Sequence, residues 1–415
     1  MNFKYFYVLI AINLFFLSSS FSQLQDSVLQ LDDIVSHILK SNPEYIKVQN
    51  EIQSLKQKSR YVSSWDDPTV GVKFDDIPTG QFIMQANRKI WFVMQTFPFP
   101  GKLTLQGKIV DKDRRVKTEE LSKLKLSLLE KAKKTYYQLY FTNKSIEIGE
   151  ENSSLLRKFQ SIASSKYSVG KASQQDILKA MVEESRITND LITLAQVKET
   201  LRAKLNTLMN REPSSPLGEP PEPKDVSFTY SLVDLQNIAM TDQQSLRSSE
   251  LNIKKEKEQK LLSQLSYLPD FFTRFEYLEN ETRQDMWAAE IGITIPFWFW
   301  HKQVPEVKEK TANIMAQTAN HRHLQNETLF MIKDAYVRLG TAKRLWNLYE
   351  SSLLTQARQA LKSAESGYKA DRVDFLNLIE SYRILESFRL EYHRSISDYF
   401  IAKTELETVV GKELN

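Results

Sequence analysis

The sequence contains no cysteine among its 415 residues. Disulfide bonds, thiolate metal sites and cysteine nucleophiles are therefore excluded, as is an acyl anchor on an N-terminal cysteine. Positive and negative charges nearly balance, with a formal net charge of +4. This balance favours no particular partner, and for an exported chain nucleic acid is not an expected one.

Long apolar runs are also missing, apart from one at the N-terminus. Residues 5–17 are almost wholly apolar, follow Lys4 and precede the small-residue stretch Ser20-Phe21-Ser22. This pattern predicts an export signal over residues 1–22, with an N-terminal membrane anchor as the alternative. The run is shorter than the ~20 residues that span a bilayer, which favours cleavage after Ser22. Because no later run approaches that length, the rest of the chain can cross a membrane only as β-strands.

Proline is confined to a few clusters, and its absence elsewhere predicts long helices. None of the 13 prolines lies between Lys102 and Glu212 or after Pro305. Since proline in a helix interior costs about 3 kcal/mol, these two runs of about 110 residues are expected to be helical. Apolar residues recur at steps of three or four over residues 102–166, which predicts a rod of roughly 95 Å that packs along others as a coiled coil. The other helices are expected at 31–65 with a break at Asn42-Pro43, 174–210, 232–267, 306–366 and 375–411.

Upstream of each long helix lies a pair of segments with alternating apolar and polar residues. Trp287, Ile291 and Ile295 alternate with Glu290 and Thr294, a period of two that predicts a strand with one apolar face. The four strands are expected at 69–74, 90–97, 271–277 and 287–295. Aromatic residues gather at the strand ends, where they are typical of a membrane–water boundary. They are Trp65, Trp91, Phe97, Phe99, Phe271, Tyr277, Trp287, Phe297, Trp298 and Trp300.

The same pattern is written twice along the chain. A turn motif that begins at Tyr167 reads Y-S-V-G-K-A-S-Q-Q-D-I-L, and its degenerate copy from Tyr368 reads Y-K-A-D-R-V-D-F-L-N-L-I. A unit of about 200 residues is too long for a solenoid repeat and indicates two tandem halves of one symmetric body. The proline-rich stretch 213–223 predicts an extended linker between repeats at 23–212 and 224–415.

Four strands per chain are too few to close a membrane barrel, since the smallest closed barrels have about 8. Other copies of the chain must complete the sheet, and three copies would supply 12 strands. The expected fold is therefore mainly α with a small β part. Two tandem repeats form long coiled-coil segments of an α-helical barrel, and each chain adds four transmembrane strands. Together they would form a tube that extends roughly 100 Å into an aqueous space.

These motifs resemble the TolC family of bacterial outer-membrane efflux proteins. The resemblance rests on the two turn motifs, Asn42-Pro43 and the strand exits at 95–102 and 295–303, and it covers both repeats. It implies a homotrimer with a 12-stranded barrel in outer-membrane lipid and a helical tunnel in the periplasm. The implied function is the exit duct of a tripartite efflux or type I secretion system. Its implied partners are a periplasmic adaptor and an RND-type or ABC-type inner-membrane pump. The stretch 295–303 also resembles strand exits in heavy-metal efflux members.

The resemblance assigns adaptor docking and pore opening to the two periplasmic turns. The implied docking residues are Tyr167, Val169, Gly170, Lys171, Ala172 and Ser173 in the first turn, and Tyr368, Ala370, Asp371, Arg372 and Val373 in the second. Gly170 can take a positive φ in a tight reversal, and Ser173 and Asp374 stand where an N-cap would begin the returning helix. Asp371 replaces the glycine of the family, but aspartate tolerates left-handed backbone better than most residues.

Acidic residues near these turns form a candidate pore gate: Asp176, Asp371, Asp374 and Glu380. With Lys369 and Arg372, ion pairs could hold a closed state, and around a symmetry axis the carboxylates would favour cations. Helix capping and surface charge without a gating role is the alternative, and the sequence favours neither.

No enzymatic site is expected, because the sequence has no G-x-S-x-G elbow, no glycine-rich phosphate loop and no carboxylate pair. No cofactor or resident metal is expected either, since His321 and His323 would point to different faces of a helix. The alternatives to a channel are a periplasmic adaptor and a soluble coiled-coil scaffold. Adaptors typically carry a single hairpin within β-domains, and a scaffold has no use for alternating strands with aromatic ends. The cargo, whether metal ion, drug or polypeptide, is not defined by the sequence.

Overall fold

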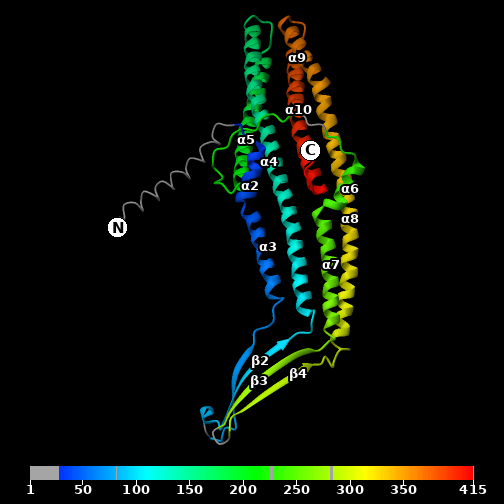
Figure 1. Ribbon diagram of the computed structural model, residues 1–415. Coiled ribbons are helices and arrows are strands. Elements are labelled where there is room, and N and C mark those ends of the chain that lie inside the picture. The colour runs from blue at the N-terminus through cyan, green and yellow to red at the C-terminus, as the bar shows by residue number, and fades with distance from the viewer. Residues whose placement is uncertain (1–27, 81, 225–227, 281–283, 415) are drawn as a thin grey trace, which may run out of the picture. The chain divides into compact units, whose positions relative to one another are not determined.

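The computed structural model describes residues 28–80, 82–224, 228–280 and 284–414. The export signal predicted over residues 1–22 lies outside them. Helices and strands follow one another in the predicted order in both repeats (Figure 1). The first repeat contains α2 (Leu31–Ser41), α3 (Pro43–Tyr61), β1 (Thr69–Asp75), the short helix η1 (Ile83–Gln85), β2 (Arg88–Phe97), α4 (Lys102–Ser168) and α5 (Gln174–Leu208). The second contains α6 (Leu232–Asp242), α7 (Gln244–Leu265), β3 (Asp270–Asn280), β4 (Met286–Thr294), α8 (Gln303–Leu348), the π-helical turn η2 (Tyr349–Leu353), α9 (Leu354–Lys369) and α10 (Phe375–Val410).

Two interruptions differ from the sequence-based expectation. α6 and α7 are separate helices that meet at Gln243, and the second long helix contains the π-helical turn η2. Neither place has proline or glycine, so the residues that usually mark a break are missing there. Pro305, by contrast, lies in the first turn of α8, where a missing N–H costs nothing because that group has no helical partner.

Contacts between residues divide the chain into two compact units. The helical unit comprises the described residues of 1–46, 123–243 and 328–415, and the sheet unit comprises 47–122 and 244–327. Each unit takes segments from both repeats, because α4 and α8 contribute residues to both. The compact units thus do not follow the repeat boundaries, which remain a prediction from the sequence.

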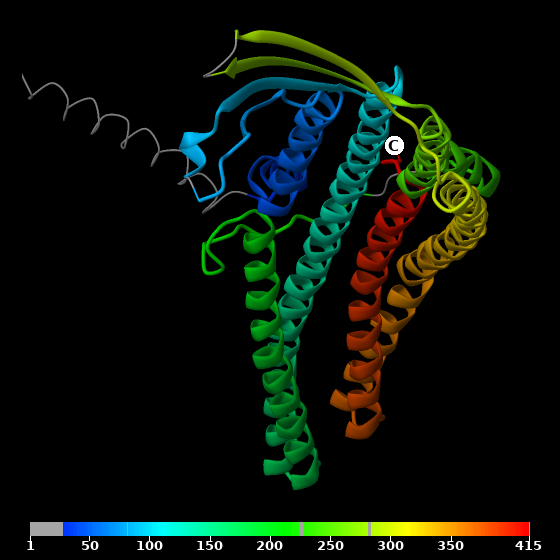
Figure 2. The same cartoon turned by 90° about the horizontal axis from the view of Figure 1, so that it is seen from below.

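The sheet unit holds one antiparallel sheet in the order β1-β2-β3-β4 (Figures 1 and 2). Its central pair, β2 and β3, joins the two repeats. Two rows of this sheet are rich in aromatic residues. In the tryptophan row, Trp91 lies opposite Tyr277, which lies opposite Trp287. In the phenylalanine row, Phe97 lies opposite Phe271.

Both rows lie on one face of the sheet, called here the aromatic face. Its side chains are widely exposed, with Trp287 at 80% and Ile291 at 81%. The opposite face, called the charged face, carries Arg274, Glu276 and Glu290, and Arg274 Nη2 lies 2.7 Å from Glu276 Oε1. The predicted alternation of apolar and polar residues is therefore confirmed.

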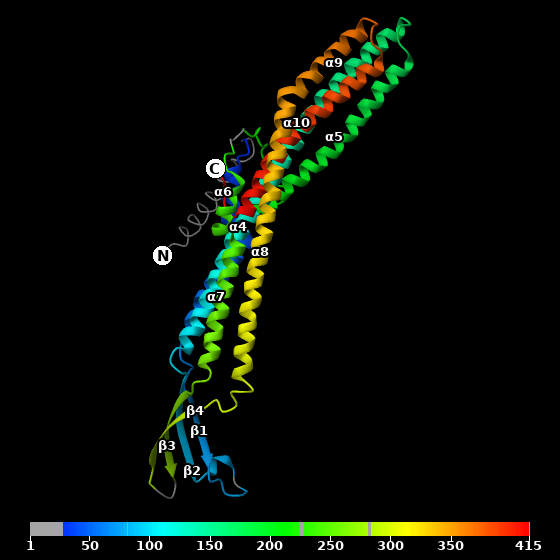
Figure 3. The ribbon, with the colours of Figure 1, turned by 90° about the vertical axis from the view of Figure 1, so that its right-hand side faces the viewer.

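The helical unit is built around two apolar clusters. Figure 3 shows the hairpins α4–α5 and α9–α10 side by side, with both turns at the same end. Near the turns, Phe159 of α4 packs edge-to-face against Tyr382 of α10, with ring centroids 6.3 Å apart. Farther from the turns, Tyr399 packs against Trp346 at 5.5 Å. The apolar stripes of the long helices thus meet one another, as the coiled-coil prediction requires.

None of the helices in the described part of the chain combines the length and the apolar composition that a membrane crossing needs.

Asn42 forms the joint between α2 and α3 and is 6% exposed. Its Oδ1 accepts hydrogen bonds from the backbone N–H groups of Glu44, at 3.0 Å, and Tyr45, at 3.3 Å. Its Nδ2 donates to the carbonyl of Leu208 at the end of α5, at 2.9 Å. The residue therefore caps α3 and ties this joint to the helix that returns from the first turn.

Replacing Asn42 by alanine is expected to lower the free energy of unfolding by about 1–3 kcal/mol, because a cap and a buried hydrogen bond are lost together. Asn42→Ser keeps a capping oxygen and loses only the bond to Leu208, so its loss should be smaller. Guanidinium unfolding followed by far-UV circular dichroism measures both. Equal losses in the two variants would show that the cap contributes nothing.

Candidate functional site

The first turn reverses the chain between α4 and α5. Gly170 has φ +74°, in the left-handed region, as predicted. The backbone N–H of Gly170 donates to Tyr167 at 3.0 Å, and that of Lys171 donates to Lys166 at 2.8 Å, which closes the end of α4. Ser173 occupies the N-cap position of α5, as predicted, but its hydroxyl donates to Asp176 Oδ1 at 3.2 Å and does not cap a backbone N–H.

The second turn has the same shape with a different residue at its centre. Asp371 has φ +58°, so aspartate takes the left-handed position that glycine takes in the first turn. The backbone N–H of Arg372 donates to the carbonyl of Gly367 at 2.9 Å. Asp374 caps α10, since its Oδ1 accepts from the N–H of Asn377 at 2.9 Å. Both expectations for this turn, left-handed aspartate and capping aspartate, are confirmed.

The two turns are joined by charge. The ammonium group of Lys166 donates to Asp371 Oδ1 and to the carbonyl of Tyr368. Lys171 Nζ lies 3.2 Å from Asp371 Oδ2. Hydrogen bonds from these lysines hold the pKa of the Asp371 carboxyl below its usual value. The predicted charge cluster therefore needs correction: Asp371 pairs with lysines of the first turn, while Lys369 pairs with Glu365 at 2.7 Å.

Tyr368 is the buried residue of this pair of turns. It is 4% exposed, whereas its counterpart Tyr167 is 49% exposed. The Tyr368 hydroxyl donates to Asp176 Oδ2 at 3.4 Å, and its ring packs against Phe375 at 5.4 Å. Burial, with the nearby Asp176 carboxylate, raises the pKa of Tyr368 to about 12, so the hydroxyl stays a donor. One of the two equivalent tyrosines therefore links the hairpins and the other faces solvent.

The remaining predicted residues line or border the space between the turns. A cavity of about 550 Å³ there is lined by residues that include Lys166, Lys171, Ser173, Asp176, Asp371 and Asp374. The exposed residues are Val169, Gly170, Lys171, Ser173, Ala370, Arg372, Asp374 and Glu380, and the half-buried ones are Ala172 and Val373. The structure thus brings Asp176 and Asp371 into links between the hairpins, and leaves Asp374 as a cap and Glu380 on the exposed side of α10.

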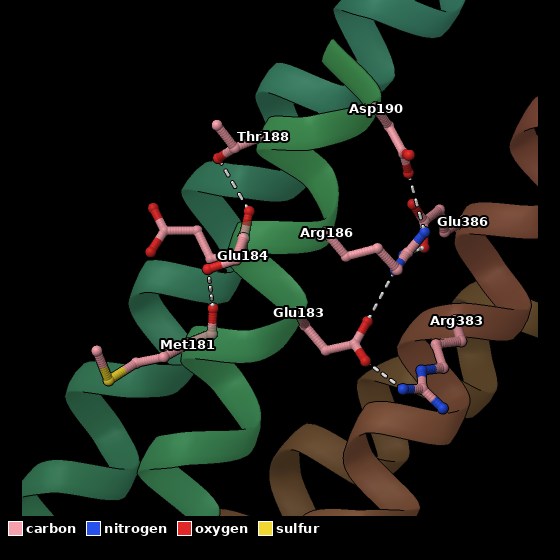
Figure 4. Close-up of polar contacts among 9 residues, drawn as sticks. Met181, Glu183, Glu184, Arg186, Thr188, Asp190, Arg383 and Glu386 are labelled. Carbon is pink, nitrogen blue, oxygen red and sulfur yellow. Dashed lines mark hydrogen bonds and ion pairs between the residues drawn. The ribbon is translucent and has the colours of Figure 1, made fainter. Parts of the chain in front are cut away.

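A second set of charges, which sequence reasoning missed, joins α5 to α10 farther along the hairpins from the turns (Figure 4). Glu183 is 4% exposed and accepts from Arg186 Nε at 3.1 Å and from Arg383. Arg186 also donates to Glu386 Oε2 at 2.5 Å and to Asp190 Oδ2 at 3.2 Å. This arginine–glutamate network begins at Glu183, about 14 Å along α5 from its first residue Gln174. The sequence contained a pattern that could have predicted the network. Glu-x-x-Arg in the first repeat, from Glu183, lies opposite Arg-x-x-Glu in the second, from Arg383.

The two glutamates of the network are shifted in opposite directions. Burial alone would raise the pKa of Glu183, but hydrogen bonds from Arg383 and Arg186 outweigh it and hold that pKa below the ordinary 4.5. Burial dominates at Glu386 and raises its pKa, although Arg186 opposes the shift. Glu183 therefore stabilises the folded chain above about pH 4.5 and loses this effect as the pH falls, while Glu386 has the opposite dependence.

Glu183→Gln is expected to lower the free energy of unfolding at pH 7 by about 1–3 kcal/mol. Removing one partner of a buried pair costs about 3–5 kcal/mol, and the half-exposed arginines reduce this figure through solvent screening. The difference from the unmodified chain should shrink as the pH falls below 4.5, because Glu183 is progressively protonated on the way through its lowered pKa. Unfolding curves collected across this pH range measure it.

Glu184→Gln is the matched control for this variant. Glu184 is adjacent in sequence, and its Oε1 pairs with Arg157, whose side chain is 69% exposed, at 2.7 Å. Its loss should be within about 0–1 kcal/mol, as for surface ion pairs. If both variants lose the same stability, the network has no special role in holding α5 to α10.

Comparison with solved structures identifies the fold. The chain is similar to the outer-membrane channel OprN, with a TM-score of 0.79 and 14% identity over 94% of each chain. It is also similar to the outer-membrane protein VceC of Vibrio cholerae, with a TM-score of 0.78 and 14% identity over 93% of this chain and 97% of VceC. A third similar structure is CusC, from a study of folding and transmembrane channel formation. Its TM-score is 0.78, with 12% identity over 94% of this chain and 96% of CusC. No protein-family model matches the chain, and no curated protein matches its sequence. The coarser expectation, a mainly helical protomer with a small antiparallel sheet, is therefore confirmed.

Proposed function

We propose that this chain is one protomer of a TolC-type outer-membrane channel, the exit duct of a tripartite efflux or type I secretion system. The observation that carries the proposal is the sheet, whose aromatic face is exposed and whose opposite face carries Arg274, Glu276 and Glu290. The tryptophan and phenylalanine rows lie six residues apart on β2, about 20 Å along the strand. This is of the order of the apolar band of membrane barrels, roughly 25 Å. The likeness to outer-membrane channels of nearly equal length supports the same conclusion.

Closure by identical neighbours follows from the edges of the sheet. Among the described residues β1 and β4 each pair on one side only, so their free N–H and C=O groups need a partner strand. In a membrane such an edge is not tolerated, because no water satisfies it. Three protomers would form a barrel of 12 strands, more than the minimum of about 8. The helical hairpins would then surround a common axis in the periplasm.

We propose that the adaptor docks on the two turns, at the end of the hairpins that faces the inner-membrane pump of RND or ABC type. Its exposed residues, among them Val169, Lys171 and Arg372, are available to a docking hairpin. Just behind them, Asp371 and Asp176 hold the two hairpins together through Lys166 and Tyr368. We infer that these links keep the tip narrow at rest and that docking breaks them. Asp374 and Glu380 would add negative charge around the opening, favouring cations.

An outer-membrane location and a trimer are the first expectations to test. The protein should sediment with outer membranes, require detergent for extraction, and have three times its protomer mass by light scattering after the detergent is subtracted. These results are expected because the aromatic face is stable only in contact with lipid. Recovery as a water-soluble monomer would contradict the proposal and favour the scaffold or adaptor alternative.

Asp371→Asn is expected to raise the single-channel conductance several-fold in planar bilayers. Asparagine tolerates the left-handed backbone at this position, so the turn survives while the ion pairs with Lys166 and Lys171 are lost. Asp374→Asn is the matched control, because it removes a charge from the same turn and retains the cap of α10. Equal conductance changes in both would indicate a general charge effect around the opening and no specific link between the turns.

A further inference from the structure

Two phenylalanines on the charged face lean over glycines of neighbouring strands. Phe92 of β2 is directly opposite Gly71 of β1, and Phe272 of β3 is directly opposite Gly292 of β4. A Cβ atom placed on Gly71 would lie 2.6 Å from Cζ of Phe92, and one on Gly292 would come closer still to the ring of Phe272. Each ring therefore occupies the space that any larger residue would need.

The two ring–glycine pairs exchange places between the repeats. Gly71 and Phe272 lie at equivalent positions, about 200 residues apart, on the first strand of each repeat. The residue that pairs with this position on the second strand is Phe92 in the first repeat and Gly292 in the second. The order is glycine then phenylalanine in the first repeat, and the reverse in the second. As a result both rings lean away from the central pair β2–β3, toward the outer strands of the described sheet.

The space above the central pair is taken by Arg274. Its guanidinium lies 4.3 Å from the centre of the Phe92 ring and also pairs with Glu276. Phe92 is therefore held between the backbone of Gly71 and a cation, which is a favourable stacking arrangement. Side chains that would stand up from the sheet are folded down onto it on both sides of this arginine.

We propose that Phe92 and Phe272, each leaning over a glycine of the neighbouring strand, set the width of the barrel lumen. This rests on the proposed function, in which the aromatic face meets lipid and the charged face lines the pore. A phenylalanine that stood upright would project far into the lumen, whereas a ring that leans over a glycine projects less far but still narrows it. Three protomers would contribute six such rings, and the charged surface left open to cargo would include Arg274, Glu276 and Glu290.

The absence of native cysteine allows a direct test with single introduced thiols. Glu290→Cys lies on the charged face of β4, and Ala289→Cys lies beside it on the aromatic face. Maleimide reagents of increasing polymer size, added outside intact cells, report how wide the lumen is at Glu290→Cys whatever the state of the periplasmic turns. Ala289→Cys should react with none of these polar reagents. If both thiols react equally, the facing of the sheet is wrong and the proposed function fails with it.

Adding Gly292→Ala to the Glu290→Cys protein should push the Phe272 ring into the lumen. The large reagents should then react more slowly, by roughly threefold or more, while the smallest reagent is little affected, since access depends on pore radius. The further change Phe272→Ala should restore the rate. Ala288→Val is the matched control, because it enlarges a residue on the same face and strand that lies opposite Glu276, not opposite a ring.

A further variant covers the case in which Gly292→Ala fails to assemble. Phe272→Ala alone, with Gly292 retained, should speed the reaction of the large reagents with Glu290→Cys, since the phenyl ring is removed from the lumen wall. One contrary result is a reaction rate with the same dependence on reagent size in Gly292→Ala, in Phe272→Ala and in the parent Glu290→Cys protein, with Ala289→Cys still protected. That result would overturn the proposal that these rings set the lumen width and leave the channel proposal standing. A slowing by Ala288→Val equal to that by Gly292→Ala would overturn it as well.

Discussion

The structure depends on one constraint, a sheet with two free edges and an exposed apolar face. β1 and β4 each lack a strand on one side within the described residues, and the aromatic face presents Trp287 and Ile291 almost fully. Water can satisfy the edges but not the face, and lipid can satisfy the face but not the edges. In the proposed channel, strands from further copies within a membrane would satisfy both.

The two repeats have diverged so that they complement each other. The first turn supplies Lys166 and Lys171, and the second supplies Asp371 where the first has Gly170. A second set of contacts between the repeats forms where Glu-x-x-Arg on α5 meets Arg-x-x-Glu on α10. In the sheet, glycine and phenylalanine exchange strands between the repeats, but each of those pairs lies within one repeat. The charge pairs between the turns and between α5 and α10 therefore join the two halves through residues in which the repeats differ.

Much of this fold could be predicted from local patterns in the sequence. Proline clusters, period-two strands and the repeated turn motif identified every strand and both hairpins, and Gly170 and Asp371 have the predicted left-handed backbone. The breaks at Gln243 and η2 could not be predicted, because no helix-breaking residue marks them. The partners of Asp371 were also predicted wrongly. Sequence proximity pointed to Lys369 and Arg372, whereas Lys166 lies about 200 positions away and meets Asp371 only because the hairpins align.

That alignment gives the arginine–glutamate network a physical role that its net energy does not. Buried ion pairs often contribute little stability compared with apolar residues of the same size, but they specify which groups meet. A shift of one helical turn between α5 and α10 would be about 5.4 Å. Such a shift would separate Glu183 from Arg383 and Arg186 from Glu386 together. It would also carry Lys166 away from Asp371. The network thus fixes the register of α5 against α10, and under the proposed function it would preserve that register when docking breaks the links between the two turns.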